Sequence, residues 1–194
     1  MIAESQYIRA PVPQKILIIK PSSLGDVVHG LPFLAAMRDL YPKAEIHWLI
    51  AAGLDGLLLN HPMVNRLWIV NKDRWKRARN APETVAEMAQ LARDLRNEAF
   101  NMVVDLQGLL RSGLITFSTG APIRIGFREA REGSVLFYTH RISSSRDVHA
   151  VDRLMTIAAA LGYYGEEISF PLPLVKEEES MRALKDEMGN YFVI

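Results

Sequence analysis

The sequence predicts an α/β domain built on a mainly parallel sheet, and three observations support this fold class. Short, nearly continuous runs of apolar residues alternate along the chain with segments of helical periodicity. Such runs are typical of strands buried on both faces of a parallel sheet, with helices as the crossover connections. The length of 194 residues, 49% of them hydrophobic, fits one sizeable globular domain.

Five strands are expected from the apolar runs. The first extends from Lys15 to Lys20, is rich in isoleucine, and is followed by a turn from Pro21 to Asp26. The other four are expected at 45–50, 66–70, 101–106 and 123–126. Helical segments separate most of these runs, which favours parallel pairing.

The first helical segment extends from the turn to about Leu40. Pro32 lies inside it and is expected to kink the helix or delay its start, because proline lacks a backbone donor and clashes with the preceding turn. Shorter helices are expected at 54–60 and 109–118.

Two further helices have clear start or stop signals. Asn80, Pro82 and Glu83 form a start signal for an amphipathic helix that continues to about residue 98, with an apolar face at 85, 88, 91 and 95. Asp147 is expected to cap a last helix, and Gly162 is expected to end it.

Composition excludes several classes of function. The chain has no cysteine, which removes disulfide scaffolds, zinc ribbons and cysteine nucleophiles and is compatible with a reducing cytosol. A net charge of +1 argues against a nucleic-acid-binding protein. Neither a glycine-rich nucleotide motif nor a metal-binding histidine spacing is present, so no cofactor and no metal are expected. No apolar run has the 18 or more residues of a membrane-spanning helix, so any membrane contact should be peripheral.

Candidate site residues lie just after the predicted strands, because ligands of open α/β sheets bind beyond the carboxyl ends of the strands. This rule selects Ser22, Ser23, Gly25 and Asp26, then Gln107 and Arg111, then the loop near Arg128. Asp26 has two interpretations. It can cap the helix that begins there, or it can act as a general base that the helix dipole keeps ionised.

Two other features leave alternatives open. Arg74, Lys76 and Arg77 flank Trp75 in a basic tract. The tract fits a solvated surface, a clamp for a carboxylate or phosphate, or a nucleic-acid contact with bases stacked on Trp75, although the rest of the chain has no matching basic face. His149, just inside the helix that Asp147 is expected to cap, either points into the same crevice or is bonded to backbone.

The two ends of the chain differ from its middle. Residues 1–14 contain two prolines and no continuous apolar core, and we expect a flexible tail there. A charged helix is expected at 176–188, and a strand-like apolar run begins at Tyr191. A strand that begins where the chain stops suggests that the sequence is part of a longer protein.

Four ordered motifs carry a resemblance to a known family. They are Lys20-Pro-Ser-Ser-Leu-Gly-Asp-Val-Val-His29, Asp105-Leu-Gln-Gly-Leu-Leu-Arg-Ser112, Gly126-Phe-Arg-Glu-Ala-Arg-Glu132 and His149-Ala-Val-Asp-Arg153. In this order they resemble the motifs of the bacterial ADP-heptose:lipopolysaccharide heptosyltransferases of glycosyltransferase family nine, in particular the heptosyltransferase I type.

This resemblance implies an architecture and an activity. It implies a GT-B enzyme, of which residues 15–188 are the N-terminal acceptor-binding domain, a Rossmann-like α/β/α layer structure, while 189–194 begin a C-terminal nucleotide-sugar domain. The implied reaction transfers a heptose from ADP-heptose to a Kdo sugar of the lipopolysaccharide inner core, Kdo-lipid A, with inversion and without a catalytic metal. It implies a cytoplasmic enzyme peripheral to the inner membrane.

The resemblance also implies roles for individual residues. Asp26 matches the position of the family's base. The acceptor-binding positions are implied to be Ser22, Ser23, Gly25, Arg74, Lys76, Arg77, Gln107, Arg111, Arg128 and His149. Two other functions fit the residues: a non-catalytic α/β module that binds an anionic glycan or phosphate, and a family-nine transferase with a different acceptor.

Overall fold

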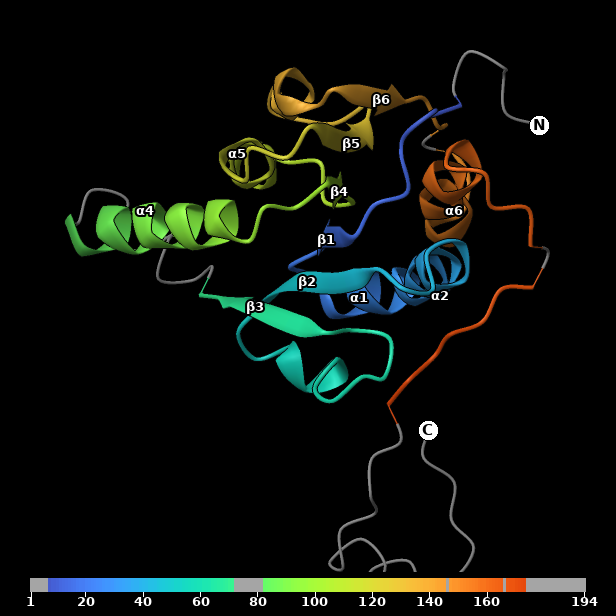
Figure 1. The fold of residues 1–194 in the computed structure, drawn as a ribbon, viewed down its shortest axis with the longest axis horizontal. Helices are drawn as coiled ribbons and strands as arrows, with labels where there is room; N and C mark the ends of the chain where they lie inside the picture. The colour runs from blue at the N-terminus through green and yellow to red at the C-terminus, as the bar shows by residue number, and fades with distance from the viewer. Residues whose placement is uncertain (1–6, 72–81, 146, 166, 174–194) are drawn as a thin grey trace, which may run out of the picture.

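A sheet of six parallel strands forms the centre of the computed structural model, which describes residues 7–71, 82–145, 147–165 and 167–173 (Figure 1). The strands lie in the order β3-β2-β1-β4-β5-β6, and every neighbouring pair is parallel. They are β1 (Lys15–Ile19), β2 (Glu45–Ala51), β3 (Arg66–Val70), β4 (Met102–Asp105), β5 (Ile123–Phe127) and β6 (His140–Ile142). The predicted fold class is confirmed, and β6 is an edge strand that the sequence did not indicate.

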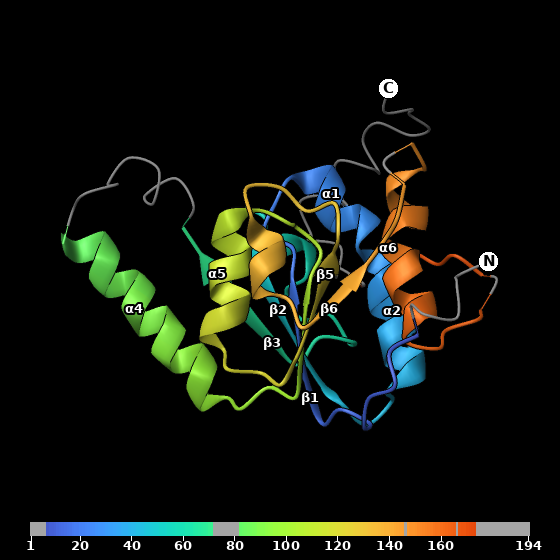
Figure 2. The ribbon, with the colours of Figure 1, turned by 90° about the horizontal axis from the view of Figure 1, so that it is seen from above.

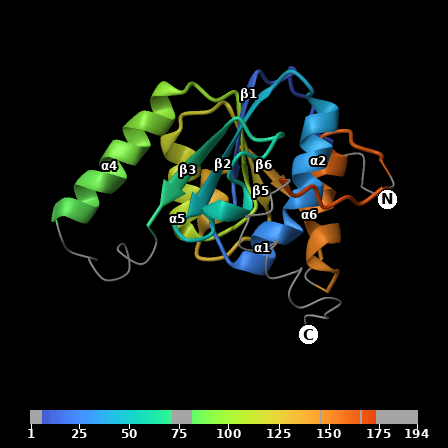
Figure 3. The ribbon, with the colours of Figure 1, turned by 90° about the horizontal axis from the view of Figure 1, so that it is seen from below.

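Helices cover both faces of the sheet, which gives three layers (Figures 2 and 3). The helices α1, α2 and α6 lie on one face, and α4 and α5 lie on the other. Their bounds are α1 (Leu24–His29), α2 (Leu31–Leu40), α4 (Pro82–Asn97), α5 (Leu110–Ser118) and α6 (Ala150–Ala160). The described residues also form two short 3₁₀ helices, η2 (Asp55–Leu57) and η3 (Ser134–Phe137). A longer helix, at 54–60, was expected in place of η2.

The first predicted helix is broken in two, as Pro32 indicated. Gly30 separates α1 from α2, and Pro32 lies in the first turn of α2, where a missing N–H costs nothing. Gly30 also allows a close approach, because a Cβ atom there would lie 2.9 Å from the indole ring of Trp48. The break therefore comes from proline placement together with packing against β2.

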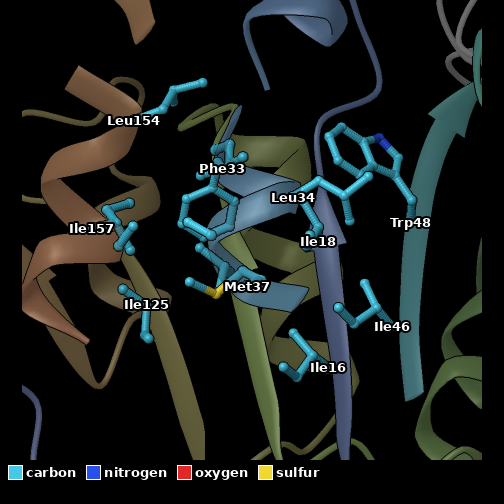
Figure 4. Close-up of a cluster of buried hydrophobic side chains, with 14 of the residues drawn as sticks. Ile16, Ile18, Phe33, Leu34, Met37, Ile46, Trp48, Ile125, Leu154 and Ile157 are labelled. Carbon is cyan, nitrogen blue, oxygen red and sulfur yellow. The ribbon is translucent and has the colours of Figure 1, made fainter. Parts of the chain in front are cut away.

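The apolar side chains of β1 point alternately to two cores. Ile16 and Ile18 pack with residues of α2, α6 and neighbouring strands, among them Phe33 and Trp48 (Figure 4). Leu17 and Ile19 belong to a second core on the face covered by α4 and α5. This two-sided burial is why the strand is a continuous apolar run in the sequence.

Two local expectations are corrected and one is confirmed. Residues 147 and 148 precede α6, and the N-cap of α6 is His149, whose Nδ1 accepts from the N–H of Val151 at 3.3 Å, so Asp147 is not the cap. Gly162 follows the end of α6 with a φ of +100°, as expected of the stop. Val85 was expected on the apolar face of α4 but is exposed, whereas Leu95 is fully buried, because α4 packs most closely near its carboxyl end.

The part of the expected N-terminal tail that is described lies against the domain. The N–H of Ile8 donates to the carbonyl of Ala160 at 2.9 Å, and Ile8 and Ala10 pack against the first core. The expected helix at 176–188 and the run beginning at Tyr191 lie outside the described residues. Among the helices that are described, none has the length and apolar character needed to cross a membrane.

Candidate active site

A pocket of about 350 Å³ lies at the carboxyl ends of β1, β4 and β5. Lys20 and Asp26 reach it from the connection between β1 and α1, and Arg153 reaches it from α6. The remaining lining comes from 106–109 and from Phe127 and 129–131. A larger pocket, of about 690 Å³, lies at the other end of α6 beside Tyr7, and none of the candidate site residues lines it.

Asp26 is held on both of its carboxylate oxygens. Its Oδ2 accepts from the backbone N–H of Ser23 at 2.8 Å and from the Ser23 hydroxyl at 2.9 Å, which is a helix-capping arrangement. Its Oδ1 lies 3.8 Å from the ammonium nitrogen of Lys20, and the side chain is 44% exposed. One oxygen of Asp26 thus takes part in the cap of α1, and the same side chain lines the pocket.

Electrostatics favours an ionised Asp26. Partial burial opposes ionisation, but the hydrogen bonds from Ser23 and the charge of Lys20 outweigh it and hold the pKa of Asp26 below its usual value. Burial lowers the pKa of Lys20, and the charges of Asp26 and Asp105 counteract that shift. The Asp26 carboxylate is thus ionised at neutral pH.

The turn after β4 is organised by the fully buried carboxylate of Asp105. Its Oδ1 accepts from the N–H groups of Gln107 and Gly108 at 2.9 and 3.0 Å, and its Oδ2 accepts from the Tyr138 hydroxyl at 2.7 Å. Gly108 has a φ of +68°, which favours glycine. Burial raises the pKa of Asp105, although every one of these hydrogen bonds favours the carboxylate.

Of the other predicted site residues, Gln107 lines the pocket together with Asp26. Ser22 and Ser23 form the turn that leads into α1 and Gly25 lies in the first turn of α1, but none of these three lines the pocket. Arg111, Arg128 and His149 are exposed and do not line the pocket. The His149 ring meets the ring of His29 edge-on at 5.5 Å. The predicted basic clamp of Arg74, Lys76 and Arg77 lies outside the described residues.

Three residues of the site were missed as candidates from the sequence: Lys20, Asp105 and Arg153. Two of them had a signal, since Lys20 and Asp105 are charged residues at the ends of otherwise apolar strand runs. Arg153 ends the fourth motif but had no physical signal of its own, because its position in the predicted helix resembles an ordinary surface position of an amphipathic helix. Its guanidinium lies over the ring of Phe127, 4.4 Å from the centroid, which holds it beside the pocket.

Comparison with known proteins shows which family this chain is similar to. The family model described as glycosyltransferase family 9 (heptosyltransferase) matches residues 88–193, more than half of the chain. Lipopolysaccharide heptosyltransferase 1 of Escherichia coli K12 is 31% identical over 77% of this chain and 48% of its own length. The lipopolysaccharide core heptosyltransferase OpsX of Haemophilus influenzae is 26% identical over 86% of this chain and 46% of its own length.

Solved structures agree with these relatives. The E. coli heptosyltransferase WaaC with ADP-2-deoxy-2-fluoro heptose has a TM-score of 0.71 and 29% identity, covering 80% of this chain and 51% of that one. A family 9 glycosyltransferase of Veillonella parvula, 20% identical, shares the fold with a TM-score of 0.76 over 92% of this chain and 50% of that one. The chain spans about half the length of the curated relatives it matches. It belongs to glycosyltransferase family 9.

Proposed function

We propose that the complete gene product transfers a heptose from ADP-heptose to a Kdo sugar of the lipopolysaccharide inner core. The observation that carries this proposal is the ionised Asp26 at the wall of a pocket that also contains Lys20, Arg131 and Arg153. Cationic side chains suit an acceptor sugar that carries a carboxylate. The relatives named above are lipopolysaccharide heptosyltransferases, which supports the same substrate class.

In the proposed reaction Asp26 is the general base. The acceptor hydroxyl attacks the anomeric carbon of the heptose, its proton passes to the Asp26 carboxylate, and ADP leaves with the electron pair of the broken C–O bond. Attack opposite the leaving group inverts the anomeric centre. A carboxylate of lowered pKa suits a step in which the proton is lost late, when the hydroxyl has already become acidic.

We assign acceptor binding to this chain and the main nucleotide contacts of ADP-heptose to the part of the relatives that it does not span, as in a GT-B enzyme. The turn of Ser22, Ser23 and Gly25 would then lie against the acceptor sugar. Gln107, which lines the pocket, would contact the same sugar. Arg111, Arg128 and His149, which lie outside the pocket lining, would contact more distant parts of the acceptor, and the Arg74, Lys76 and Arg77 tract would meet its anionic groups.

We also propose peripheral contact with the cytoplasmic face of the inner membrane. The α5 helix supports this proposal because it exposes Leu110, Leu114 and Phe117 by 40%, 43% and 57% at successive helical turns. Arg111 is exposed on the same helix, and α5 begins directly after the pocket-lining Leu109. An apolar and basic helix beside the pocket suits a lipid-linked acceptor in an anionic membrane.

The test is a transfer assay with the complete gene product. ADP-heptose and a Kdo-bearing lipid A acceptor are incubated with the protein, ADP release is followed, and the product is identified by mass spectrometry. We expect equal amounts of ADP and heptosylated acceptor, and no ADP release with lipid A that lacks Kdo. Failure to consume ADP-heptose would remove the substrate assignment. Transfer to an acceptor without Kdo would assign a different family-nine acceptor.

A further inference from the structure

Lys20 occupies an unusual position for a lysine. It follows the last residue of β1, is only 7% exposed, and its Nζ lies 3.4 Å from the carbonyl oxygen of Leu106 and 3.8 Å from Oδ1 of Asp26. Its backbone is fixed on the side of β2, since its N–H donates to the Leu49 carbonyl at 3.3 Å and its carbonyl accepts from the Trp48 indole at 3.2 Å. The ammonium group therefore joins the loops after β1 and β4, which both line the pocket.

The surrounding charges explain why an ammonium group is retained there. A buried cation is costly unless carboxylates or hydrogen-bond acceptors lie near it. The charges of Asp26 and Asp105 favour the protonated form of Lys20, and they do so against the opposing positive charge of Arg153 on α6. Asp105 already accepts three hydrogen bonds from Gln107, Gly108 and Tyr138. Asp26 uses Oδ2 for Ser23, and its Oδ1 faces Lys20.

We propose that Lys20 is a positioning residue for the proposed base: its ammonium group holds the Oδ1 edge of the Asp26 carboxylate at the pocket wall, while Ser23 holds the Oδ2 edge. The proposal rests on the proposed function for the role of Asp26, but the charge coupling between the two side chains does not depend on it. Two opposite restraints leave the carboxylate little freedom to turn away from a bound hydroxyl. The same ammonium charge keeps Asp26 ionised.

Lys20→Met tests the proposal, because methionine has a similar length and no charge. We expect the acidic limb of the pH profile of kcat/KM to move upward by roughly one pH unit, since loss of a nearby cation raises a carboxylate pKa. We expect kcat to fall about tenfold or more, with KM for ADP-heptose unchanged. Lys43→Met is the matched control, because it removes the same charge from an exposed position and should leave both quantities at their wild-type values.

A titration separates this proposal from the proposed function. The carboxyl carbon of Asp26, identified by its loss in Asp26→Asn, is followed by NMR against pH in the wild-type, Lys20→Met and Lys43→Met proteins. We expect the Asp26 pKa to rise only in Lys20→Met. Equal values in all three proteins would overturn the positioning role. If the Asp26 pKa is raised in Lys20→Met but the wild-type protein has no transferase activity, the proposed function alone would be overturned.

A measurement on the wild-type protein keeps the test valid if Lys20→Met fails to fold. When Lys20 loses its proton at alkaline pH, the Asp26 carboxyl carbon resonance should shift with the same midpoint as the Lys20 Nζ resonance. An Asp26 resonance that stays constant through that transition would contradict the coupling.

Discussion

The Tyr138 hydroxyl donates a 2.7 Å hydrogen bond to Oδ2 of the fully buried Asp105, and this bond connects the end of β4 to the segment between η3 and β6. The same carboxylate fixes the Gln107 and Gly108 turn through its other oxygen. Burial and the charge of Asp105 raise the pKa of Tyr138, so the phenol remains a donor at any physiological pH. The geometry of one wall of the pocket thus depends on a side chain that is remote in sequence.

Tyr138→Phe removes this donor without changing the shape of the ring. A hydrogen bond to a charged acceptor contributes about 1.5–3 kcal/mol, and its loss leaves part of a buried carboxylate unsatisfied. We expect the free energy of unfolding to fall by about that amount in urea denaturation. Tyr164→Phe, at an exposed position, is the control and should change it by less than about 0.5 kcal/mol. Equal effects of the two substitutions would contradict the role of the buried bond.

Gly126→Ala should break the same hydrogen bond between Tyr138 and Asp105 by displacing the tyrosine ring. A Cβ atom on Gly126 would lie 2.3 Å from Cε2 of Tyr138, so the ring must move and its hydroxyl must leave Asp105. We expect the free energy of unfolding to fall by at least about 2 kcal/mol, because overpacking adds to the lost hydrogen bond. Gly56→Ala provides the comparison, since its added methyl meets no atom within 4 Å. A thermal melt that shows no difference between the two variants would refute this account of Gly126.

His47 should make the stability of the fold depend on pH. It is fully buried, its Nδ1 accepts from the Trp68 indole at 3.1 Å, and its Nε2–H donates to Glu45 at 2.9 Å. Burial lowers its pKa despite the attraction of Glu45, so the folded state favours the neutral ring. The unfolded chain then binds more protons below the ordinary histidine pKa of about 6.5.

The stabilisation from a neutral His47 is therefore complete above about pH 6.5 and decreases as the pH falls toward the folded pKa. The decrease can reach about 1.4 kcal/mol per pH unit. Urea unfolding of the wild-type protein between pH 7 and 5.5 should show this slope, and His47→Gln should show a smaller one. Identical slopes would show that His47 does not titrate differently in the two states.

The predictable parts of the fold and site are those that depend on local sequence. The apolar run of β1 and the Ser22 to Asp26 turn identify a strand, a helix start and a carboxylate without knowledge of any distant contact. The edge strand β6 was missed because its three residues include His140 and Arg141, and its pairing with β5 comes from the tertiary fold. Neither the bond from Tyr138 to Asp105 nor the position of Arg153 beside Phe127 has a local pattern, so neither was predictable.

The most direct test of the central claim is the turnover number of the complete gene product that carries Asp26→Asn, with ADP-heptose and the Kdo-bearing acceptor. The asparagine side-chain oxygen can still accept from the N–H of Ser23, so the start of α1 should be kept and the variant should remain folded, with its unfolding midpoint lowered only by the loss of the charge beside the buried Lys20. It cannot take up the acceptor proton. We predict a kcat at least about 100-fold below the wild-type value. A kcat within a few-fold of wild type would contradict the account and leave Asp26 only its capping role.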